Sequence, residues 1–411
     1  MEGYGRMAGV LENDRCVIVF SNGIMKSYRL LIIAWYVNLY HPSEFIRNLK
    51  KINPGVDISL MYSKPIVEAI PEDLYENTEE LICVKTYSGR IRIKLFRILA
   101  DRILFLKSFI HVSKQKYDIV NIHYAKPRLS YVMSWIKRSA KTIVISPWGS
   151  DVLRVEGESR IKHLRKVYSL ASYVTVSKDS NIGKQVIEKF GVDSNKLVKL
   201  GWGGDLFDFI QNNKSSVSIE SAKERFGLNG RFVITCGYNP QIQQRHEEII
   251  NAINGIRDQL PDNLTLLFPF TYGYGGLEYY RESIKEKAKG LGIPFVSVEE
   301  RLNMSDLLKL RMATDIFVHI QTTDAGSRSV MEYVLLNKKV VHGSWIKYAY
   351  LEKYRPSCYF PIDRLEDLGE CILKAYNTKI GPLPQEVMDI IMARGWKQRM
   401  ILWNSFFESV I

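Results

Sequence analysis

The chain has 411 residues, of which 46% are hydrophobic and 25% are charged, and these proportions exclude a disordered, collagen-like or coiled-coil protein. At about 150 residues per domain, the length predicts two or three domains. Lys and Arg number 57 against 44 acids, a net charge of +13. This surplus favours an anionic partner, such as a phosphorylated small molecule, an anionic lipid surface or a nucleic acid.

Cysteine usage and hydropathy indicate a protein of the reducing interior of the cell. The five cysteines are an odd number without a Cys-x-x-Cys pair, so we expect neither a disulfide framework nor a structural zinc site; they are Cys16, Cys83, Cys236, Cys358 and Cys371. The longest apolar run, residues 30–37, is far shorter than the roughly 18 residues of a membrane-spanning helix. Residues 1–15 lack the apolar core of a secretory signal. We therefore expect a cytoplasmic protein.

The first half of the chain alternates short runs rich in valine and isoleucine with longer stretches of helical periodicity. The expected strands are residues 30–37, 57–62, 119–123, 142–146, 173–177 and 197–200, and the expected helices are residues 43–51, 94–112, 129–139, 160–170 and 181–190. Such alternation is typical of a parallel sheet covered on both faces. Residues 1–205 are therefore predicted to form a Rossmann-like domain, in which residues 1–27 are not assigned.

A second alternating series follows a glycine-rich and polar stretch, residues 201–218, which is predicted to be a linker. Its expected strands are residues 232–236, 264–269, 295–298, 316–320 and 339–342, and its expected helices are residues 245–259, 277–291, 305–312, 328–336 and 365–376. Residues 206–383 are predicted to be a second Rossmann-like domain. Residues 384–411 read as a final helix broken near Gly395. The fold class is α/β, with ligands expected at the carboxyl ends of the strands.

Positive charge is concentrated between residues 85 and 116, where nine Lys or Arg accompany a single acid, Asp101. Apolar residues recur between these cations at helical spacing. This pattern is typical of a helix that lies on an anionic membrane. A core helix with a solvated basic face explains the same pattern.

Two loops of the first half contain candidate site residues at strand ends. His123 closes a predicted strand, where it could donate hydrogen bonds or carry a proton near neutral pH. The loop SPWGSD follows the next strand and contains Trp148, Gly149 and Asp151. Gly149 permits a positive φ, so this loop could present backbone N–H groups and a carboxylate to a ligand. A structural histidine, and an ordinary turn with Asp151 as a helix N-cap, explain the same residues.

The second half has two further candidate sites. The segment from 234 to 250 runs from a strand through Gly237 and Asn239 into a helix that starts near Arg245. A cation at a helix N-terminus is suited to a diphosphate, although a surface arginine is the simpler interpretation. Asp324 lies in a loop before a helix that carries Glu332. Carboxylates suit the paired hydroxyls of a ribose or a sugar, but two acids at this interval also arise by chance.

Taken together, these motifs resemble the family 4 retaining glycosyltransferases, which have the GT-B fold. Five segments carry the resemblance in the family's order: DIVNIHYAKP with the active-site histidine, SPWGSD for the H-G-S-D loop, VSKDS with VKLGWGGDLFDF for the V-S strand and its closing linker, CGYNPQIQQRH for G-R-x-x-x-x-K-G, and TTDAGSRSVME for the paired glutamates. The similarity runs from about residue 30 to the C-terminus. Trp148 stands where the family commonly has a histidine. Departures at Asn239, Arg245 and Asp324 indicate a divergent branch, of the type that assembles bacterial surface polysaccharides.

The resemblance implies two Rossmann-like domains that face each other across a cleft, with the last helix returning to the first domain. It implies transfer of a hexose-type sugar from a nucleotide diphosphate sugar to a glycan or lipid-linked acceptor, with retention at the anomeric carbon, in polysaccharide or lipopolysaccharide biosynthesis. A front-face route is expected, in which the leaving phosphate takes the acceptor proton. No metal ion and no other cofactor are expected. The enzyme would be peripheral, on the inner face of the cell membrane.

The resemblance also implies a role for each candidate residue. His123 and Asp324 would be catalytic, with Asp324 on the donor sugar. Glu332 would bind the ribose, and the diphosphate would contact the segment that contains Gly237, Asn239 and Arg245. Trp148, Gly149 and Asp151 would form an acceptor or cleft loop.

Other classes of protein explain parts of the pattern. A nucleotide-sugar epimerase or an inverting transferase could use the same fold, and product stereochemistry distinguishes the two kinds of transferase. A catalytically inactive GT-B-like scaffold is another alternative, because the departures fall at donor contacts. Nucleic-acid binding is not expected, since no nucleic-acid module is recognisable and the cations cluster on an apolar segment.

Overall fold

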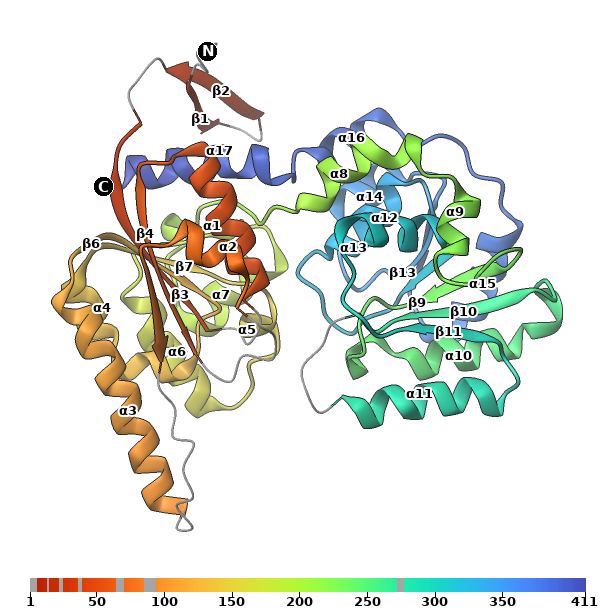
Figure 1. Ribbon diagram of the computed structural model, residues 1–411, viewed down its shortest axis with the longest axis horizontal. Coiled ribbons are helices and arrows are strands. Elements are labelled where there is room, and N and C mark those ends of the chain that lie inside the picture. Colours follow the sequence, from red (N-terminus) through yellow and green to blue (C-terminus); the bar gives the residue numbers. More distant parts are fainter. Residues whose placement is uncertain are drawn as a thin grey trace. The chain divides into compact units, whose positions relative to one another are not determined.

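The computed structural model describes residues 6–12, 15–21, 25–35, 39–63, 70–84, 94–271 and 277–411 of the chain. The chain forms two α/β units (Figure 1). Unit 1 comprises Met1–Gly203 together with Trp396–Ile411, and unit 2 comprises Gly204–Gly395. The predicted α/β class, with one parallel sheet in each half, is confirmed.

Unit 1 contains a six-stranded parallel sheet with the strand order β5-β4-β3-β6-β7-β8. Its strands are β3 (Tyr28–Ala34), β4 (Val56–Ser63), β5 (Glu80–Val84), β6 (Tyr117–His123), β7 (Ala140–Ser146) and β8 (Tyr173–Val174). Leu31 and Ile33 of β3 enter the core on one face of the sheet, and Leu30 and Ile32 enter the core on the other. This alternation follows from the two-residue period of a strand, and it explains why the strand is apolar throughout.

Helices cover both faces of this sheet. They are α1 (Tyr40–Ile52), α2 (Glu72–Asn77), α3 (Lys94–Lys114), α4 (Met133–Ser139), α5 (Ser150–Leu153), α6 (Glu158–Ser169) and α7 (Asn181–Phe190). At α7 the Ser180 side chain accepts a hydrogen bond from the Gly183 N–H, and Gly191 ends the helix in the left-handed conformation. These are the preferred residue types for an N-cap and for the end of a helix.

Three parts of unit 1 differ from the sequence prediction. Strand β5 was not predicted, because it is short and only alternate residues are buried. Residues 197–200 do not form a strand, since a single bridge joins Leu197 to Val174. Residues 6–21, which the pattern left unassigned, contain the antiparallel hairpin β1 (Arg6–Glu12) and β2 (Arg15–Ser21). The last residues of the predicted strand 30–37 lie outside the described residues.

Unit 2 contains a second six-stranded parallel sheet, with the order β11-β10-β9-β12-β13-β14. Its strands are β9 (Phe232–Cys236), β10 (Leu264–Pro269), β11 (Phe295–Val298), β12 (Ile316–His319), β13 (Lys339–Gly343) and β14 (Tyr359–Ile362). Its helices are α8 (Asp205–Asn213), α9 (Ile219–Glu224), α10 (His246–Gly255), α11 (Glu278–Gly290), α12 (Met304–Ala313), α13 (Arg328–Leu335), α14 (Ala349–Tyr354), α15 (Leu368–Asn377) and α16 (Gln385–Met392). Five strands were predicted; the sixth, β14, was not.

The predicted linker needs correction, while the predicted break of the final helix near Gly395 is confirmed. The stretch 201–218 is not a loop throughout, because α8 begins at Asp205 and buries Leu206, Phe207 and Ile210 in unit 2. The final segment is divided at Gly395: α16 belongs to unit 2, while α17 (Trp396–Ser409) belongs to unit 1. None of the helices within the described ranges has both the length and the hydropathy of a membrane-spanning segment.

Helix α17 completes the core of unit 1. The Trp403 ring is fully buried and meets Phe45 of α1 edge-on, with ring centres 5.0 Å apart. Its indole N–H donates a 2.9 Å hydrogen bond to the Gly201 carbonyl. Gly203 is required nearby, since a Cβ there would lie 2.4 Å from Cδ2 of Trp396. The last helix is therefore part of the core of unit 1, and Phe45, on which Trp403 packs, also packs on His123 at the end of β6.

We predict that Trp403→Ala lowers the free energy of unfolding of unit 1 by about 3–5 kcal/mol, the cost of removing a large buried aromatic ring. Denaturant unfolding followed by circular dichroism measures this change. Lys397→Ala, an exposed position on the same helix, should change stability by less than about 0.5 kcal/mol. Equal stability of the two variants would contradict the assigned role of α17.

Candidate functional site

In unit 1 the candidate residues gather at the carboxyl ends of β6 and β7. His123 is the last residue of β6, and its ring is fully buried. Ser146 Oγ–H donates to Asn121 Oδ1 at 2.6 Å, which turns the Asn121 amide so that Nδ2 lies 3.0 Å from His123 Nε2. An amide nitrogen can only donate, so Nε2 is the acceptor. The hydrogen of the neutral ring therefore lies on Nδ1.

Burial keeps His123 neutral and leaves this hydrogen available. Burial lowers the pKa of His123 to about 3, because the charged ring would lose its hydration. In the part of the chain that the structure describes, His123 Nδ1 has no hydrogen-bond partner. The site thus has a donor for a ligand oxygen, but His123 is not a proton carrier near neutral pH.

An aromatic cluster surrounds His123. Its ring centre lies 5.1 Å from that of Phe45 and 4.9 Å from that of Trp202, both edge-on. Trp148 is half-buried between His41 at 5.1 Å and Trp202 at 5.2 Å. The Trp202 indole N–H donates to the Pro147 carbonyl at 3.1 Å. His41 and Trp202 were not among the predicted site residues, because His41 lies early in a helix and Trp202 in the presumed linker.

Asp151 is buried and holds the loop around Gly149. Its Oδ1 accepts hydrogen bonds from the N–H groups of Trp148 and Gly149 at 2.9 and 3.0 Å. Its Oδ2 accepts one from the Ala125 N–H at 3.2 Å. Burial raises the pKa of Asp151 to about 6, although these hydrogen bonds act to lower it. Gly149 has φ 116°, as the sequence suggested. Asp151 therefore joins the loops after β6 and β7.

In unit 2, Gly237 follows β9 and lies against the start of α10. Its φ is 63°, and a Cβ there would lie 2.9 Å from Gln244 Oε1 and 3.1 Å from His246 Nε2. His246 is fully buried; its Nδ1 lies 3.0 Å from the Tyr280 hydroxyl, and its Nε2 has no hydrogen-bond partner among the described residues. Because Gly237 has no Cβ, Gln244 Oε1 and His246 Nε2 can lie close to the backbone of the loop.

Arg245 stands at the N-cap position of α10, and its guanidinium lies 5.4 Å from the Trp345 ring centre. Within the described residues no carboxylate lies at ion-pair distance from it. Glu247, in the first turn, pairs with Lys287 at 3.7 Å. Asn239 is buried, and its Oδ1 accepts a hydrogen bond from the Gln241 N–H. Arg245 is therefore the candidate that can meet an anion here, while Asn239 shapes the loop.

Glu332 is buried on α13 and is paired with an arginine that the sequence did not suggest. Its Oε2 accepts a hydrogen bond from Arg311 Nε of α12 at 2.9 Å. Arg311 also donates to the Tyr333 hydroxyl at 3.2 Å and to Ser329 Oγ at 3.1 Å. Oε1 of Glu332 accepts no hydrogen bond from any described residue. Oε2 of Glu332 is thus engaged by Arg311, and Oε1 is available to a ligand.

The Asp324 side chain, in the loop before α13, is 8% exposed. Its carboxylate contacts the Gly326 and Ser327 N–H groups, the Tyr348 hydroxyl and the His319 ring. Burial acts to raise the pKa of Asp324, but the neighbouring His319 and the Tyr348 hydroxyl outweigh it and hold the pKa below its ordinary value. The hydrogen-bond partners of Asp324 thus differ from the Arg311 partner of Glu332.

Gln321 joins the loops of unit 2 and was missed by the sequence analysis. Its Oε1 accepts hydrogen bonds from the Tyr238 hydroxyl at 2.7 Å and from Gln244 Nε2 at 2.6 Å. Its carbonyl accepts one from the Trp345 indole at 2.8 Å. His319, which ends β12 as His123 ends β6, was also missed. The rule that selected His123, a histidine at the carboxyl end of a parallel strand, would have found it.

The sequence matches the family described as glycosyl transferase 4-like over residues 34–178. This match confirms the resemblance to the family 4 glycosyltransferases, and it lies within unit 1. Among proteins with curated functions, no sequence matches this one.

Solved structures show the fold of the whole chain. It is similar to sucrose-phosphate synthase from Thermosynechococcus elongatus, with a TM-score of 0.67, 11% identity, and coverage of 93% of this chain and 98% of that one. It is similar to Anabaena HepE in complex with UDP and glucose, with a TM-score of 0.60, 14% identity, and coverage of 93% of this chain and 97% of that one. It is also similar to the lipopolysaccharide outer core galactosyltransferase WaaB, with a TM-score of 0.59, 10% identity, and coverage of 93% of this chain and 99% of that one. The fold is thus the GT-B fold of glycosyltransferases.

We predict that His123 makes the protein less stable in acid. The stability that comes from its neutral ring is complete above the ordinary pKa of 6.5 and is lost as the pH falls toward 3. In His123→Gln the free energy of unfolding should therefore decrease less steeply between pH 6.5 and 3, by up to about 1.4 kcal/mol per pH unit. Denaturant unfolding at several pH values measures the slope. His111→Gln, at an exposed histidine of α3, should leave the slope nearly unchanged; an equal effect of both variants would contradict the prediction.

Proposed function

We propose that this chain is a retaining glycosyltransferase whose unit 2 binds a nucleotide diphosphate sugar and whose unit 1 binds the acceptor. The family match and the fold support the class of enzyme. The binding site proposed for the nucleotide sugar is formed by residues of unit 2. The role proposed for His123 depends on the hydrogen that its ring carries on Nδ1.

The proposed binding site for the diphosphate of the nucleotide sugar is the N-terminal end of α10. Arg245 offers a cation, and the first N–H groups of a helix attract an anion. His246 Nε2 is a buried polar atom without a partner among the described residues, and it lies beside Gly237. A diphosphate would neutralise the cation and accept hydrogen bonds from the backbone. We assign this end of α10 to the diphosphate, and the open Oε1 of Glu332 to the ribose hydroxyls.

In the proposed reaction, the bond from the anomeric carbon to the leaving phosphate oxygen breaks. The bond to the acceptor oxygen forms on the same face of the sugar, and the acceptor proton passes to the leaving phosphate. Arg245 would stabilise the charge that develops on the diphosphate. His123 would donate its Nδ1 hydrogen to an oxygen of the reacting sugar or of the acceptor. The proposal includes no metal ion, because arginine and backbone N–H groups carry the diphosphate.

The acceptor is proposed to be a glycan or a lipid-linked glycan of a surface polysaccharide or lipopolysaccharide. WaaB is a lipopolysaccharide galactosyltransferase, and HepE is complexed with UDP and glucose. WaaB supports this setting, and HepE supports a uridine nucleotide as the first donor to test.

We predict that one of UDP, GDP and TDP stabilises the protein in a thermal-shift panel, by about 2.7 kcal/mol at a hundredfold excess over Kd. Glu332→Gln should weaken that binding by about 10-fold or more, the cost of a lost hydrogen bond to a charged group. The variant keeps an oxygen for Arg311, which a change to alanine would leave buried without its partner. EDTA should not alter the shift.

Glu224→Gln, at an exposed position of unit 2, is the matched control and should bind like the wild type. No shift with any nucleotide would favour the inactive scaffold over the transferase. A shift that Glu332→Gln leaves unchanged would remove the ribose assignment.

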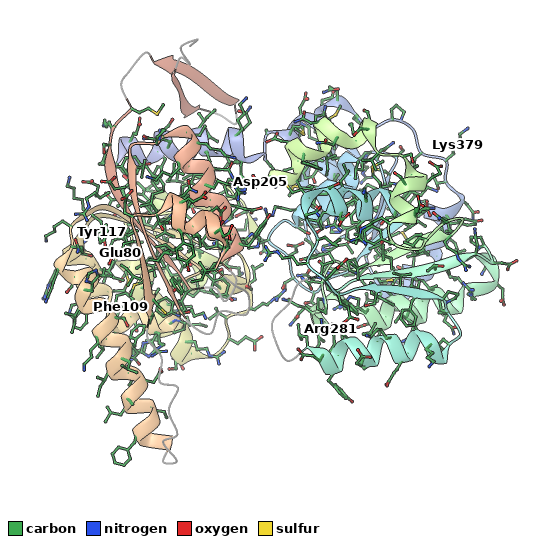
Figure 2. All side chains as sticks on the ribbon, in the orientation of Figure 1. Glu80, Phe109, Tyr117, Asp205, Arg281 and Lys379 are labelled. Carbon is green, nitrogen blue, oxygen red and sulfur yellow. The ribbon has the colours of Figure 1, made fainter. Side chains whose placement is uncertain are left out.

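Helix α3 supports a second part of the proposal, attachment to an anionic membrane. Phe105, Phe109 and Val112 pack into the core of unit 1, and Phe109 lies where the helix meets the rest of the unit (Figure 2). The N-terminal half of α3 extends beyond the sheet (Figure 1). A different face carries an exposed apolar stripe: Phe96 (55% exposed), Leu99 (52%), Ile103 (44%) and Ile110 (43%). Side chains three, four and seven residues apart share one face of a helix.

Cations flank this stripe. Arg102 and Lys107 are exposed on either side of it, and Asp101, the only acid of the segment, is neutralised by Arg128 at 2.9 Å. Apolar side chains bordered by cations suit the interface of an anionic bilayer. Lys114 and Lys116, at and after the end of α3, are also exposed, whereas the cations between residues 85 and 97 lie outside the described side chains. We propose a peripheral protein on the inner face of the cell membrane.

We predict that Leu99→Glu with Ile103→Glu reduces binding to vesicles that contain anionic lipid by about 100-fold or more, because each lost apolar side chain costs at least about 1.5 kcal/mol. Vesicle sedimentation at low salt measures binding, which should weaken at high salt. Ile219→Glu with Leu291→Glu changes two exposed apolar residues of unit 2 and is the control. Equal binding by both double variants, or no binding by the wild type, would reject the attachment site.

A further inference from the structure

Unit 2 contains a buried arginine that has no part in the proposed function. Arg311 lies on α12 beside the buried Leu310 and Met312, and only 6% of its side chain is exposed. Burying a cation is costly unless the fold supplies partners for it. Among the described residues, the hydrogen-bond acceptors of the Arg311 side chain all lie on α13.

One face of α13 matches the three nitrogens of this guanidinium. Glu332 and Tyr333 lie three and four residues after Ser329, so the three side chains share a face of the helix. Arg311 Nε donates to Glu332 Oε2 at 2.9 Å. Nη1 donates to the Tyr333 hydroxyl at 3.2 Å, and Nη2 donates to Ser329 Oγ at 3.1 Å. Because a guanidinium is planar and rigid, these three acceptors fix its orientation.

The orientation of Arg311 restricts the Glu332 carboxylate in turn. Within the parts of the chain that the structure describes, Glu332 is the only carboxylate at ion-pair distance from Arg311. A glutamate side chain has several rotatable bonds, and holding Oε2 restricts the position of Oε1. Oε1 accepts no hydrogen bond from a described residue, and 8% of the Glu332 side chain is exposed. The ion pair therefore presents one carboxylate oxygen in a fixed place.

The contribution of this ion pair to stability is a weak explanation for it. Apolar residues of similar volume in place of a buried ion pair often give equal or greater stability, because two buried charges lose their hydration. The surroundings would accept such residues: Phe317 stacks on Tyr333 with ring centres 4.1 Å apart, and Val330 and Val334 of α13 are fully buried. An ordered carboxylate has a different advantage, since a side chain that is already fixed loses less entropy when a ligand binds.

We propose that Arg311 is a positioning residue that holds Glu332 Oε1 for the ribose hydroxyls of the donor, so that the preference for these hydroxyls depends on Arg311. The ribose contact rests on the proposed function; the ion pair itself does not. Arg311 acts through Glu332 and contributes nothing to the diphosphate, which is assigned to the start of α10. Its removal should therefore affect the recognition of one part of the nucleotide only.

Two ligands that differ only in the ribose hydroxyls test this role. The nucleoside diphosphate selected by the thermal-shift panel is compared with its 2′,3′-dideoxy form, and the ratio of the two Kd values is the readout. In Arg311→Lys a single ammonium replaces the guanidinium and cannot span the three acceptors. We expect the preference for the ribose hydroxyls to fall by about 3- to 10-fold, toward its value in Glu332→Gln. The Kd of the dideoxy nucleotide should stay nearly unchanged.

Arg225→Lys is the matched control. Arg225 also pairs with a carboxylate of α12, Asp306, at 3.0 Å, but this pair lies near the surface, so the variant should keep the wild-type ratio. Ser329→Ala removes one acceptor and keeps the ion pair; it is the milder variant in case Arg311→Lys does not fold, and it should lower the ratio by a smaller factor. An unchanged ratio in the folded variant would overturn the proposal. An equal loss for both nucleotides, which a merely structural role predicts, would also overturn it.

A double-mutant cycle tests the ion pair without a ligand. Arg311→Met and Glu332→Leu should each lower the free energy of unfolding, because each leaves a buried charge without its partner. The double variant should be more stable than either single variant. Losses that simply add would show that the two side chains are not coupled and would overturn the proposal.

The two experiments also separate this proposal from the proposed function. If the nucleotide binds and Glu332→Gln lowers the preference for the ribose hydroxyls while Arg311→Lys does not, only the positioning role is wrong. If no nucleotide binds, or the wild type binds both forms equally, the ribose assignment of Glu332 and the positioning role fail together. The double-mutant cycle then still decides whether the ion pair exists.

Discussion

Parallel strand pairing is the constraint on which both candidate sites depend. In a parallel sheet all carboxyl ends lie on one edge, so the residues that end neighbouring strands meet there. In unit 1 this places His123 opposite Ser146, and in unit 2 it places His319 opposite His342. The apolar strands bury this edge of the sheet, so the polar side chains at the strand ends have to form hydrogen bonds with one another.

The two strand-end histidines have different neighbours. His123 meets an amide nitrogen and stays neutral with one hydrogen-bond donor unused. His319 lies between His342 Nδ1 at 3.1 Å and the Asp324 carboxylate at 3.2 Å. The same residue type at equivalent strand ends thus leaves a donor for a ligand in one unit and lies beside a carboxylate in the other. What differs is the chemistry of the neighbouring strand and loop.

The acids show why a spacing pattern is a weak guide to a site. Asp151 and Glu332 are buried, the Asp324 side chain is 8% exposed, and each acid is engaged by the fold. Three backbone N–H groups donate to Asp151, and two backbone N–H groups and the Tyr348 hydroxyl donate to Asp324. Only Glu332 keeps one oxygen without a described partner, since Arg311 occupies the other. The residues that hold the loops and the residues that can meet a ligand have similar sequence signatures.

Local patterns were enough to predict the α/β class, most strands of both sheets, and the order of the family-like motifs, because strand and helix periods are local properties of the chain. The short strands β5 and β14 and the helix α8 escaped prediction. The division of the final segment between the two units at Gly395 became visible only in the folded chain. The same is true of the pairing of Glu332 with Arg311 and of the position of Asp324 beside His319, because these contacts join segments that are distant in the sequence and that the sheet brings together.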